Sequence, residues 1–455
     1  MEHFTSIHPY TGDPVAVYPL MSSNQVSLAL SQAQWAYPEW SSSGFAERGR
    51  VLREVARLLR EDKDTYAELI TMEMGKIIGE ARGEVEKSAW VCDYYADNAE
   101  TFLQPEIIEA GYRKSLVRYE PVGAVLGIMP WNFPFWQVFR YAAPTLMAGN
   151  VTLLKHAPNV SGCSLAIAAL FQKAGAPEGV FQSLIIDIPL LQMVMESGIV
   201  QAATLTGSER AGASLAALAG SQIKKTVLEL GGSDPLIVLA DADISQAVAT
   251  AIQSRFLNAG QSCIGAKRFI VIAQVYQAFL EALQAGMDNL RTGDPRDPLT
   301  TTAPVARPDL AENLRRQWQA SVQRGARLVR GGEVTGCRIK PGLLLDAVPG
   351  MPAFDEETFG PLAVLTRAAD EEEAVKLANA STYGLAASIW TRDEEKGLAL
   401  AGKIQSGAVF INSLVKSDPR LPFGGIKKSG YGRELGKSGI HEFVNVKTVA
   451  LGPER

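Results

Sequence analysis

A cysteine stands among glycines and small polar residues in the stretch NAGQSCIG, residues 258–265. Cys263 follows ISQAVATAIQSRFLNAG, an apolar-patterned segment that we expect to form a helix with Gly260 just past its end. A cysteine with a pKa of about 8.5 is only a few per cent thiolate at pH 7, so a reactive role requires a nearby cation, a base or N–H donors. The stretch therefore indicates either a nucleophile that is reachable in a loop or a cysteine kept for packing.

Two further residues have side chains suited to act beside such a nucleophile. Glu229 lies in TVLELGG, where apolar neighbours would raise the pKa of its carboxyl and make it a general base. Asn132 lies in PWNFP, where two prolines stiffen the loop and the amide can be aimed at a developing oxyanion. The alternatives are a glutamate on the solvated face of an edge strand and an ordinary turn asparagine.

The histidines and cysteines form no recognisable metal site. The chain has four of each, and their spacing contains no C-x-x-C pair and no H-E-x-x-H pattern. We therefore expect neither a catalytic metal nor a disulfide framework. SGYGRELGKSG resembles a phosphate-binding P-loop, but Tyr431 replaces the required first glycine. The remaining phosphate candidate is the pair Gly207 and Ser208, which opens a helix with free N–H groups.

The composition is that of an ordinary globular protein. With 455 residues, 47% apolar and 20% charged, we expect about three compact units. A net charge of -5 argues against nucleic acid or an anionic membrane as a standing partner. Because the sequence shows neither a secretory signal nor a run of 18 apolar residues, we expect a cytoplasmic protein.

The elements that must position these residues follow from the periodicity of the sequence. Residues from about 22 to 103 have a helical pattern of apolar residues. From residue 122 onward, short apolar strands alternate with helices, which predicts a doubly wound parallel sheet. Ligands bind at the carboxyl ends of such strands. We therefore expect four segments to share one rim: 130–132, 155–158, 207–208 and 229–232.

A second alternating series follows Cys263. We expect strands at 268–273, 362–367, 385–391 and 407–412, with helices at 275–290, 308–324, 370–380 and 394–404. Segments 103–121 and 442–452 have strand character but lie outside both series. They are expected to pair with each other or with another subunit.

Seven motifs occur in an order that resembles the NAD(P)-dependent aldehyde dehydrogenase superfamily: PWNFP, LLKHAP, TGS, LELGG, GQSC, EETFGP and PFGGIKKSGYGRE. The match runs over nearly the whole chain and is most similar to the shorter bacterial succinate-semialdehyde dehydrogenases. The resemblance implies an α/β fold with two doubly wound parallel-sheet domains and a small β oligomerisation element. It implies a dinucleotide-binding domain of residues 1–102 and 122–231, a catalytic domain of residues 232–428, and oligomerisation strands at 103–121 and 440–455. A homodimer or homotetramer would follow.

The resemblance also implies roles for the three reactive residues. Cys263 would attack the aldehyde carbon to give a thiohemiacetal, whose oxyanion Asn132 and the Cys263 backbone N–H would stabilise. Hydride transfer to the nicotinamide would leave a thioester, and Glu229 would activate water to hydrolyse it. A thiol hydrolase is the alternative from another enzyme class, but it needs a histidine base. His156, beside the implied adenosine site, is a poor candidate.

Cofactor contacts are implied for residues on both sides of the rim. Lys155 would bind the adenosine ribose, Ser208 the pyrophosphate, and Glu357 with Phe359 the nicotinamide ribose and ring. Pro158 stands where NAD-preferring relatives often carry a glutamate, so NADP should be tolerated, while the preference between NADP and NAD stays open. The full implied set is Trp131, Lys155, Pro158, Gly207, Ser208, Glu357 and Phe359.

The substrate prediction depends on cations near the nucleophile. Arg140, eight residues past Asn132, matches a carboxylate-binding arginine of succinate-semialdehyde dehydrogenases. The second family arginine lies six residues before the nucleophile, where this chain has Leu257; the nearest arginine is Arg255, about 200° away around a helix.

Other candidates for substrate contact are Ser417, Arg420, Phe133 and Phe423. The expected substrate is succinate semialdehyde, a small aldehyde with a carboxylate. The alternatives are another small aliphatic or aromatic aldehyde and a non-catalytic scaffold, although a scaffold should lack one of the three reactive residues.

Overall fold

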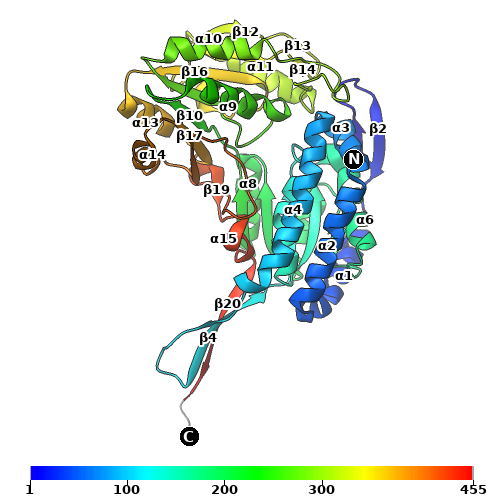
Figure 1. The fold of residues 1–455 in the computed structure, drawn as a ribbon. Helices are drawn as coiled ribbons and strands as arrows, with labels where there is room; N and C mark the ends of the chain where they lie inside the picture. Colours follow the sequence, from blue (N-terminus) through cyan, green and yellow to red (C-terminus); the bar gives the residue numbers. More distant parts are fainter. Residues whose placement is uncertain (1, 453–455) are drawn as a thin grey trace.

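The parallel strands of the first sheet end along one edge, which is the rim that the sequence predicts. The computed structural model describes residues 2–452 (Figure 1). Its first sheet has six strands in the order β19-β9-β8-β5-β6-β7, all parallel except β19. The strands are β5 (Ala124–Met129), β6 (Val151–His156), β7 (Phe181–Ser183), β8 (Val200–Thr206), β9 (Lys225–Glu229) and β19 (Gly430–Tyr431).

The helical pattern predicted for residues 22–103 is confirmed, and it forms four helices. Gly44 precedes α2 in extended conformation, and Gly75 ends α3 with a left-handed φ of 78°, which glycine adopts without steric cost. The helices of this part are α1 (Ser23–Ser42), α2 (Phe45–Glu61), α3 (Lys63–Met74), α4 (Ile78–Phe102), α5 (Trp136–Met147), α6 (Ser161–Lys173), α7 (Ile188–Glu196) and α8 (Glu209–Ser221).

The second sheet has seven strands in the order β12-β15-β16-β11-β10-β17-β18, and it lies in the upper part of Figure 1. The four predicted strands of this series are confirmed. Strands β10, β12 and β15 were not expected, because each is a run of only four residues and β10 begins with proline. The strands are β10 (Pro235–Val238), β11 (Arg268–Ile272), β12 (Arg327–Arg330), β15 (Gly342–Leu345), β16 (Leu362–Ala368), β17 (Ala386–Trp390) and β18 (Ala408–Ile411).

The helix before Cys263 ends earlier than predicted. It stops at Phe256, and a 3₁₀ segment, Leu257–Gly260, follows. Asn258 and Ala259 have positive φ values of 53° and 52°, so a left-handed turn and not a glycine cap leads into the cysteine loop. The helices of this part are α9 (Ile244–Phe256), α10 (Tyr276–Met287), α11 (Pro308–Val322), α12 (Pro352–Asp355), α13 (Glu371–Asn379) and α14 (Glu394–Ala401).

The two outlying segments pair with each other, one of the two arrangements expected. Strand β4 (Lys114–Pro121) runs antiparallel to β20 (Val444–Leu451), and β3 (Glu106–Ile107) pairs with β4 on its other edge. Figure 1 shows this three-stranded arm extending away from both sheets. The predicted segment 440–455 includes residues 453–455, which lie outside the described residues.

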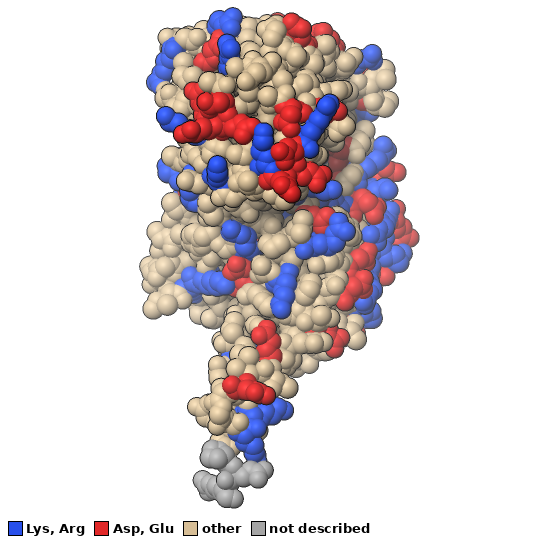
Figure 2. All heavy atoms as spheres, turned by 60° about the vertical axis from the view of Figure 1, so that its left-hand side comes forward, with Lys and Arg blue, Asp and Glu red and all other residues tan. Residues whose placement is uncertain are grey.

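Smaller elements complete the chain: β1 (His3–Ile7), β2 (Pro14–Pro19), β13 (Val334–Thr335), β14 (Arg338–Ile339), α15 (Gly436–Ile440) and the 3₁₀ turns Pro158–Val160 and Lys427–Ser429. Lys and Arg are interspersed with Asp and Glu on the face shown in Figure 2. Within residues 2–452, none of the helices combines the length and apolar character that crossing a bilayer requires.

Candidate active site

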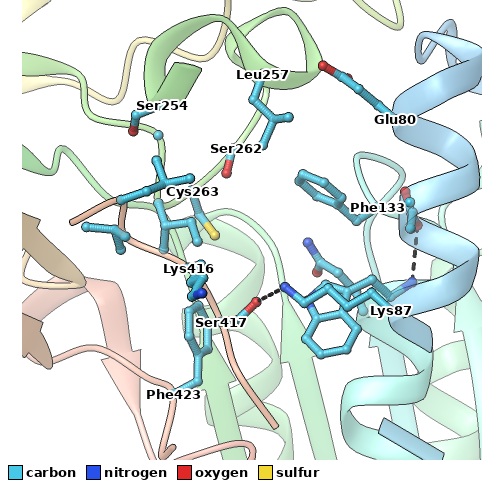
Figure 3. A pocket seen from close by; sticks show the side chains of 18 of the residues that line it. Glu80, Lys87, Phe133, Ser254, Leu257, Ser262, Cys263, Lys416, Ser417 and Phe423 are labelled. Atoms are coloured by element: carbon cyan, nitrogen blue, oxygen red, sulfur yellow. Dashed lines mark hydrogen bonds between the residues drawn. The ribbon is translucent and has the colours of Figure 1, made fainter. Parts of the chain in front are cut away.

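Four segments enclose a cavity of about 290 Å³ at the strand-end rim of the first sheet (Figure 3). They are α4, the loop and helix after β5, the loop that contains Cys263, and the loop 414–423. Five of the residues singled out from the sequence line this cavity: Cys263, Arg140, Phe133, Ser417 and Phe423. Residues 150 or more positions apart in the chain are thus brought together.

The nucleophile candidate Cys263 has its sulfur directed into the cavity (Figure 3). Lys267 fixes the loop, because its Nζ donates to the carbonyls of Ser262 at 2.8 Å and Cys263 at 2.6 Å. Burial raises the pKa of the Cys263 thiol to about 11, and the positive charges of Arg140 and Lys267 oppose this shift. The thiol is therefore protonated at neutral pH.

Asn132 is buried beside the cavity residue Phe133, and its amide orientation is fixed from both ends. Its Nδ2 donates to the carbonyl of Gln261 at 3.0 Å, and Gln137 Nε2 donates to its Oδ1 at 3.0 Å. The amide nitrogen carries two hydrogens, so one N–H remains for a substrate oxygen. Asn258 Nδ2 donates to the Asn132 carbonyl at 2.8 Å, which ties this loop to the cysteine loop.

Glu229 is the last residue of β9 and is buried. The alternative position on a solvated edge strand does not apply, because β19 pairs with β9 on its outer side. Within residues 2–452, neither carboxyl oxygen has a hydrogen-bond partner. Burial, with the nearby charge of Glu434, raises the pKa of Glu229 well above its ordinary value. The result is a desolvated carboxyl beside Gly424, next to the cavity wall.

Arg140 projects from α5 into the cavity while remaining only 2% exposed. Its Nε pairs with Glu434, its Nη2 donates to Thr206 Oγ1 at 3.2 Å, and its guanidinium carbon lies 4.6 Å from the centre of the Phe423 ring. These contacts hold the guanidinium in one orientation and already supply one counter-charge.

Neither of the two other arginines predicted for substrate contact lines the cavity. Arg255 is fully buried and does not line the cavity; its Nη2 donates to the carbonyls of Gly260, Thr358 and Gly360. Its function is therefore to hold the backbone around the cysteine loop. Arg420 is exposed and pairs with Asp418 at 2.7 Å. Leu257, where the family resemblance implies an arginine, lines the cavity instead.

Among the cofactor candidates, Lys155 is the penultimate residue of β6, and its Nζ donates to the carbonyl of His156 at 3.2 Å. Pro158 is exposed at the start of a 3₁₀ turn. Ser208 caps α8, where its Oγ accepts from the backbone N–H of Ala211 at 3.3 Å. Gly207 in the preceding turn leaves the start of this helix accessible to a pyrophosphate, and these features fit a dinucleotide.

The remaining cofactor candidates come from the second sheet and the loop after β5. Glu357 Oε1 accepts the backbone N–H of Gly232 at 3.0 Å and lies 3.5 Å from Lys267 Nζ. Trp131 and Phe359 form an edge-to-face pair with ring centres 5.8 Å apart. An aromatic pair and an anchored carboxylate at this rim fit a nicotinamide riboside, whose ring is planar and whose ribose carries hydroxyls.

Sequence reasoning missed three charged residues near the site: Lys87 on α4, Lys267 and Glu434. Lys87 shares one side of α4 with Glu80 and Glu84, at the i, i+4, i+7 spacing of a helix face, and all three line the cavity. That spacing is a signal present in the sequence. Glu434 gave no comparable signal, because it comes from a loop near the end of the chain.

His156 does not provide a base for the cysteine. Its two ring nitrogens contact the carbonyls of Met129 at 3.1 Å and Pro134 at 2.9 Å. Burial lowers its pKa to about 4, so the ring is neutral and fixed against the backbone. Within residues 2–452, no group of three or more His, Cys, Asp or Glu side chains is arranged to hold a metal ion.

Comparisons with known proteins agree with this geometry. A sequence model of the aldehyde dehydrogenase family matches residues 1–449. A probable succinate-semialdehyde dehydrogenase [NADP(+)] of Synechocystis sp. is 49% identical over 98% of both chains. The succinate semialdehyde dehydrogenase [NAD(P)+] of Escherichia coli K12 is 44% identical over 98% of this chain and 97% of that one. The crystal structure of the Streptococcus pyogenes succinic semialdehyde dehydrogenase with NADP+ superposes with a TM-score of 0.97, at 38% identity, covering 99% of this chain and 100% of that one.

Proposed function

The chain belongs to the aldehyde dehydrogenase family, and on this premise we propose that it oxidises succinate semialdehyde to succinate with NAD(P)+. The observation that carries the proposal is one cavity containing both the thiol of Cys263 and the buried guanidinium of Arg140. The thiol supplies the covalent chemistry of the family. The guanidinium supplies a recognition group for a carboxylate at the other end of a short aldehyde.

In the first step, the Cys263 thiol releases its proton to solvent, the thiolate sulfur forms a bond to the aldehyde carbon, and the π electron pair of the carbonyl moves to the oxygen, which becomes an oxyanion. The free N–H of Asn132 Nδ2 and the backbone N–H of Cys263 are the proposed donors to that oxygen. One such donor typically contributes about 2.7–4 kcal/mol to transition-state stabilisation. The contacts of the Asn132 amide with Gln261 and Gln137 keep its remaining N–H in place before the substrate arrives.

When bound, the nicotinamide supplies the hydride acceptor that converts the thiohemiacetal on Cys263 into a thioester. Glu357, Phe359 and Trp131 are the residues proposed to position the nicotinamide half. Gly207, Ser208 and Lys155 are proposed to hold the pyrophosphate and the adenosine ribose. Lys267 holds the backbone of the cysteine loop in place by donating to the carbonyls of residues 262 and 263.

Glu229 is the proposed base for hydrolysis of the thioester. It removes a proton from water, the resulting hydroxide adds to the acyl carbon, and the Cys263 thiolate leaves as succinate forms. A carboxylate with a raised pKa is a better proton acceptor at neutral pH than an ordinary glutamate.

For the cofactor, we propose that NADP+ is used at least as readily as NAD+. No carboxylate stands at position 158 to repel a 2′-phosphate, and Lys155 provides a cation nearby. The named relatives from Synechocystis and Escherichia coli carry NADP(+) and NAD(P)+ in their names. The three-stranded arm is proposed to join subunits into a dimer or tetramer, and cytoplasmic location remains a prediction.

The test is reduced-nicotinamide formation by the purified protein with succinate semialdehyde and with butanal, each with NAD+ and NADP+. Butanal has the same four-carbon chain without the carboxylate. A strong preference for succinate semialdehyde supports the proposal, and equal rates would support the alternative, a dehydrogenase of uncharged or aromatic aldehydes. Arg140→Met should remove the preference, because it should lower turnover of succinate semialdehyde far more than turnover of butanal.

A further inference from the structure

Lys87 places a second cation in the cavity, on the side opposite Leu257 (Figure 3). It projects from α4, and its Nζ donates to Ser417 Oγ at 2.8 Å. The ammonium also lies 4.2 Å from the centre of the Trp136 ring, whose face attracts cations. The hydroxyl and the ring position the ammonium, but neither neutralises its charge.

The carboxylates near Lys87 already have partners of their own. Glu84 pairs with Lys76 and accepts the backbone N–H of Phe135 at 2.8 Å. Asp418 pairs with Arg420 at 2.7 Å. Within residues 2–452, no carboxylate forms an ion pair with Lys87. A partly buried ammonium without a counter-ion is unfavourable unless a ligand supplies the negative charge.

Arg140 alone cannot supply the charge that a substrate carboxylate needs, because Glu434 already neutralises it. The position where the family resemblance implies a second arginine holds the apolar Leu257. An anion that enters this cavity therefore meets one neutralised guanidinium and two ammoniums without an ion pair in the described part of the chain, of which that of Lys416 is exposed and that of Lys87 is partly buried.

We propose that Lys87 is the second carboxylate-binding residue, which takes the place of the absent arginine and binds the substrate carboxylate together with Arg140 and Ser417. This inference rests on the proposed function, since it names the group that recognises the same substrate. Lys87 would act on specificity and not on the chemistry at Cys263, because its Nζ reaches Ser417 and not the reactive loop. Uncharged aldehydes should not require it.

A consequence of this geometry is a pH-dependent preference for the charged substrate. Burial, with the charges of Arg140 and Lys416, lowers the pKa of Lys87 to about 7, and Asp418 and Glu84 oppose the shift. The ammonium is therefore present below neutrality and is lost as the pH rises. The ratio of kcat/KM for succinate semialdehyde to kcat/KM for butanal should fall between pH 7 and 9. Effects on Cys263 and Glu229 cancel in this ratio because both substrates use them. Glu80 does not cancel: it lines the same cavity, burial raises the pKa of its carboxyl to about 7, and its ionisation would lower the ratio in the same range. The contribution of Lys87 is the part of the fall that Lys87→Met removes.

The mutational test compares Lys87→Met with Lys87→Arg and with Arg82→Met. Arg82 lies on the same helix but is exposed and pairs with Asp64 at 2.6 Å, so its variant removes one positive charge outside the site. We expect Lys87→Met to lower kcat/KM for succinate semialdehyde about 10- to 100-fold and to change that for butanal less than about 2-fold. Lys87→Arg should recover part of the loss, and Arg82→Met should match the wild type.

The other possible results distinguish a failure of the proposed function from a failure of the role proposed for Lys87. A wild type without preference for succinate semialdehyde would overturn the proposed function and this inference together. A wild-type preference that Lys87→Met retains would overturn the role of Lys87 alone. Equal losses on both aldehydes would show a structural role and would also overturn it. If Lys87→Met does not fold, the wild type provides the test. A ratio of kcat/KM for succinate semialdehyde to kcat/KM for butanal that stays constant from pH 6 to 9 would overturn the role of Lys87.

Discussion

At the scale of single residues, the thiol of Cys263 is protonated at neutral pH because burial raises its pKa more than two nearby cations lower it. Its pKa of about 11 means that the thiolate fraction of the free protein grows about tenfold per pH unit up to pH 10. The rate of alkylation by iodoacetamide should rise by the same factor between pH 7 and 10, followed by mass spectrometry of the peptide that contains Cys263.

Arg140 provides a check on the cause of this shift. Its positive charge lowers the pKa of the thiol, so Arg140→Met should slow alkylation at pH 8 by several-fold. Cys92 and Cys163 are internal controls, because both are fully buried and should remain unmodified in the folded protein. An alkylation rate that reaches its plateau below pH 8.5 would contradict a raised pKa.

Glu229 is predicted to act after hydride transfer and not before it. Glu229→Gln should therefore retain a burst of one reduced nicotinamide per active site and lose about 10²–10⁴-fold in steady turnover. In the wild type, the raised pKa means that the ionised base is present at high pH and is lost as the pH falls, so kcat should decline on the acid side. Rapid-quench kinetics measures both phases. Loss of the burst together with turnover would place Glu229 in an earlier step.

At the scale of elements, the start of α8 depends on a close approach between a helix and a strand end. A Cβ atom at Gly212 would lie 2.6 Å from Leu230 Cδ2, whereas a Cβ at Gly220, on the same helix, would have no neighbour within 4 Å. Gly212→Ala should therefore lower the free energy of unfolding by about 1–3 kcal/mol. Gly220→Ala should raise it by up to about 1 kcal/mol, because alanine is the better helix former.

Thermal or urea unfolding of the two variants measures this difference. The Michaelis constant for the dinucleotide is the second readout, because a displaced α8 would move Ser208 and the free N–H groups beside it. If Gly212→Ala is as stable as Gly220→Ala, Leu230 moves aside without loss and the packing at this helix is not tight.

The alternation of strands and helices was readable from the sequence because long periodic segments leave a strong pattern. The rim that carries Asn132, Lys155, Ser208 and Glu229 followed from that alternation alone. The left-handed turn at Asn258 and Ala259 was not readable, since neither residue type requires positive φ. Arg255 shows the same limit: its carbonyl partners lie more than 100 residues away in the chain, apart from Gly260.

At the scale of the whole molecule, the cavity depends on segments from both sheets. Lys87 lines it from an early part of the sequence, and Glu434, near the end of the sequence, pairs with the cavity residue Arg140. The order of the motifs indicated the catalytic residues Cys263, Asn132 and Glu229. Which charged side chains form ion pairs with one another is decided only by the folded structure. The pairing of Arg140 with Glu434, and the absence of any such pair for Lys87 within residues 2–452, could only be read from the structure.

The arm formed by β4, β20 and β3 presents apolar side chains that the rest of the subunit does not cover. Val446 is 61% exposed although its strand is paired, and it shares one face of the arm with its cross-strand partner Tyr119. An exposed apolar surface on a short sheet with an open edge is typical of a contact between subunits. We expect Val446→Asp to weaken assembly, because the contact would bury an unpaired carboxylate.

Light scattering coupled to size-exclusion chromatography measures the change in mass at several protein concentrations. The matched control is Asn445→Asp, which adds the same charge one residue away on β20, where the alternation of the strand directs the side chain to the other face. The wild type should elute as a dimer or tetramer, Val446→Asp as smaller species with an intact fold by circular dichroism, and Asn445→Asp as the wild type. Equal masses for the wild type and Val446→Asp would exclude this face of the arm from the subunit contact.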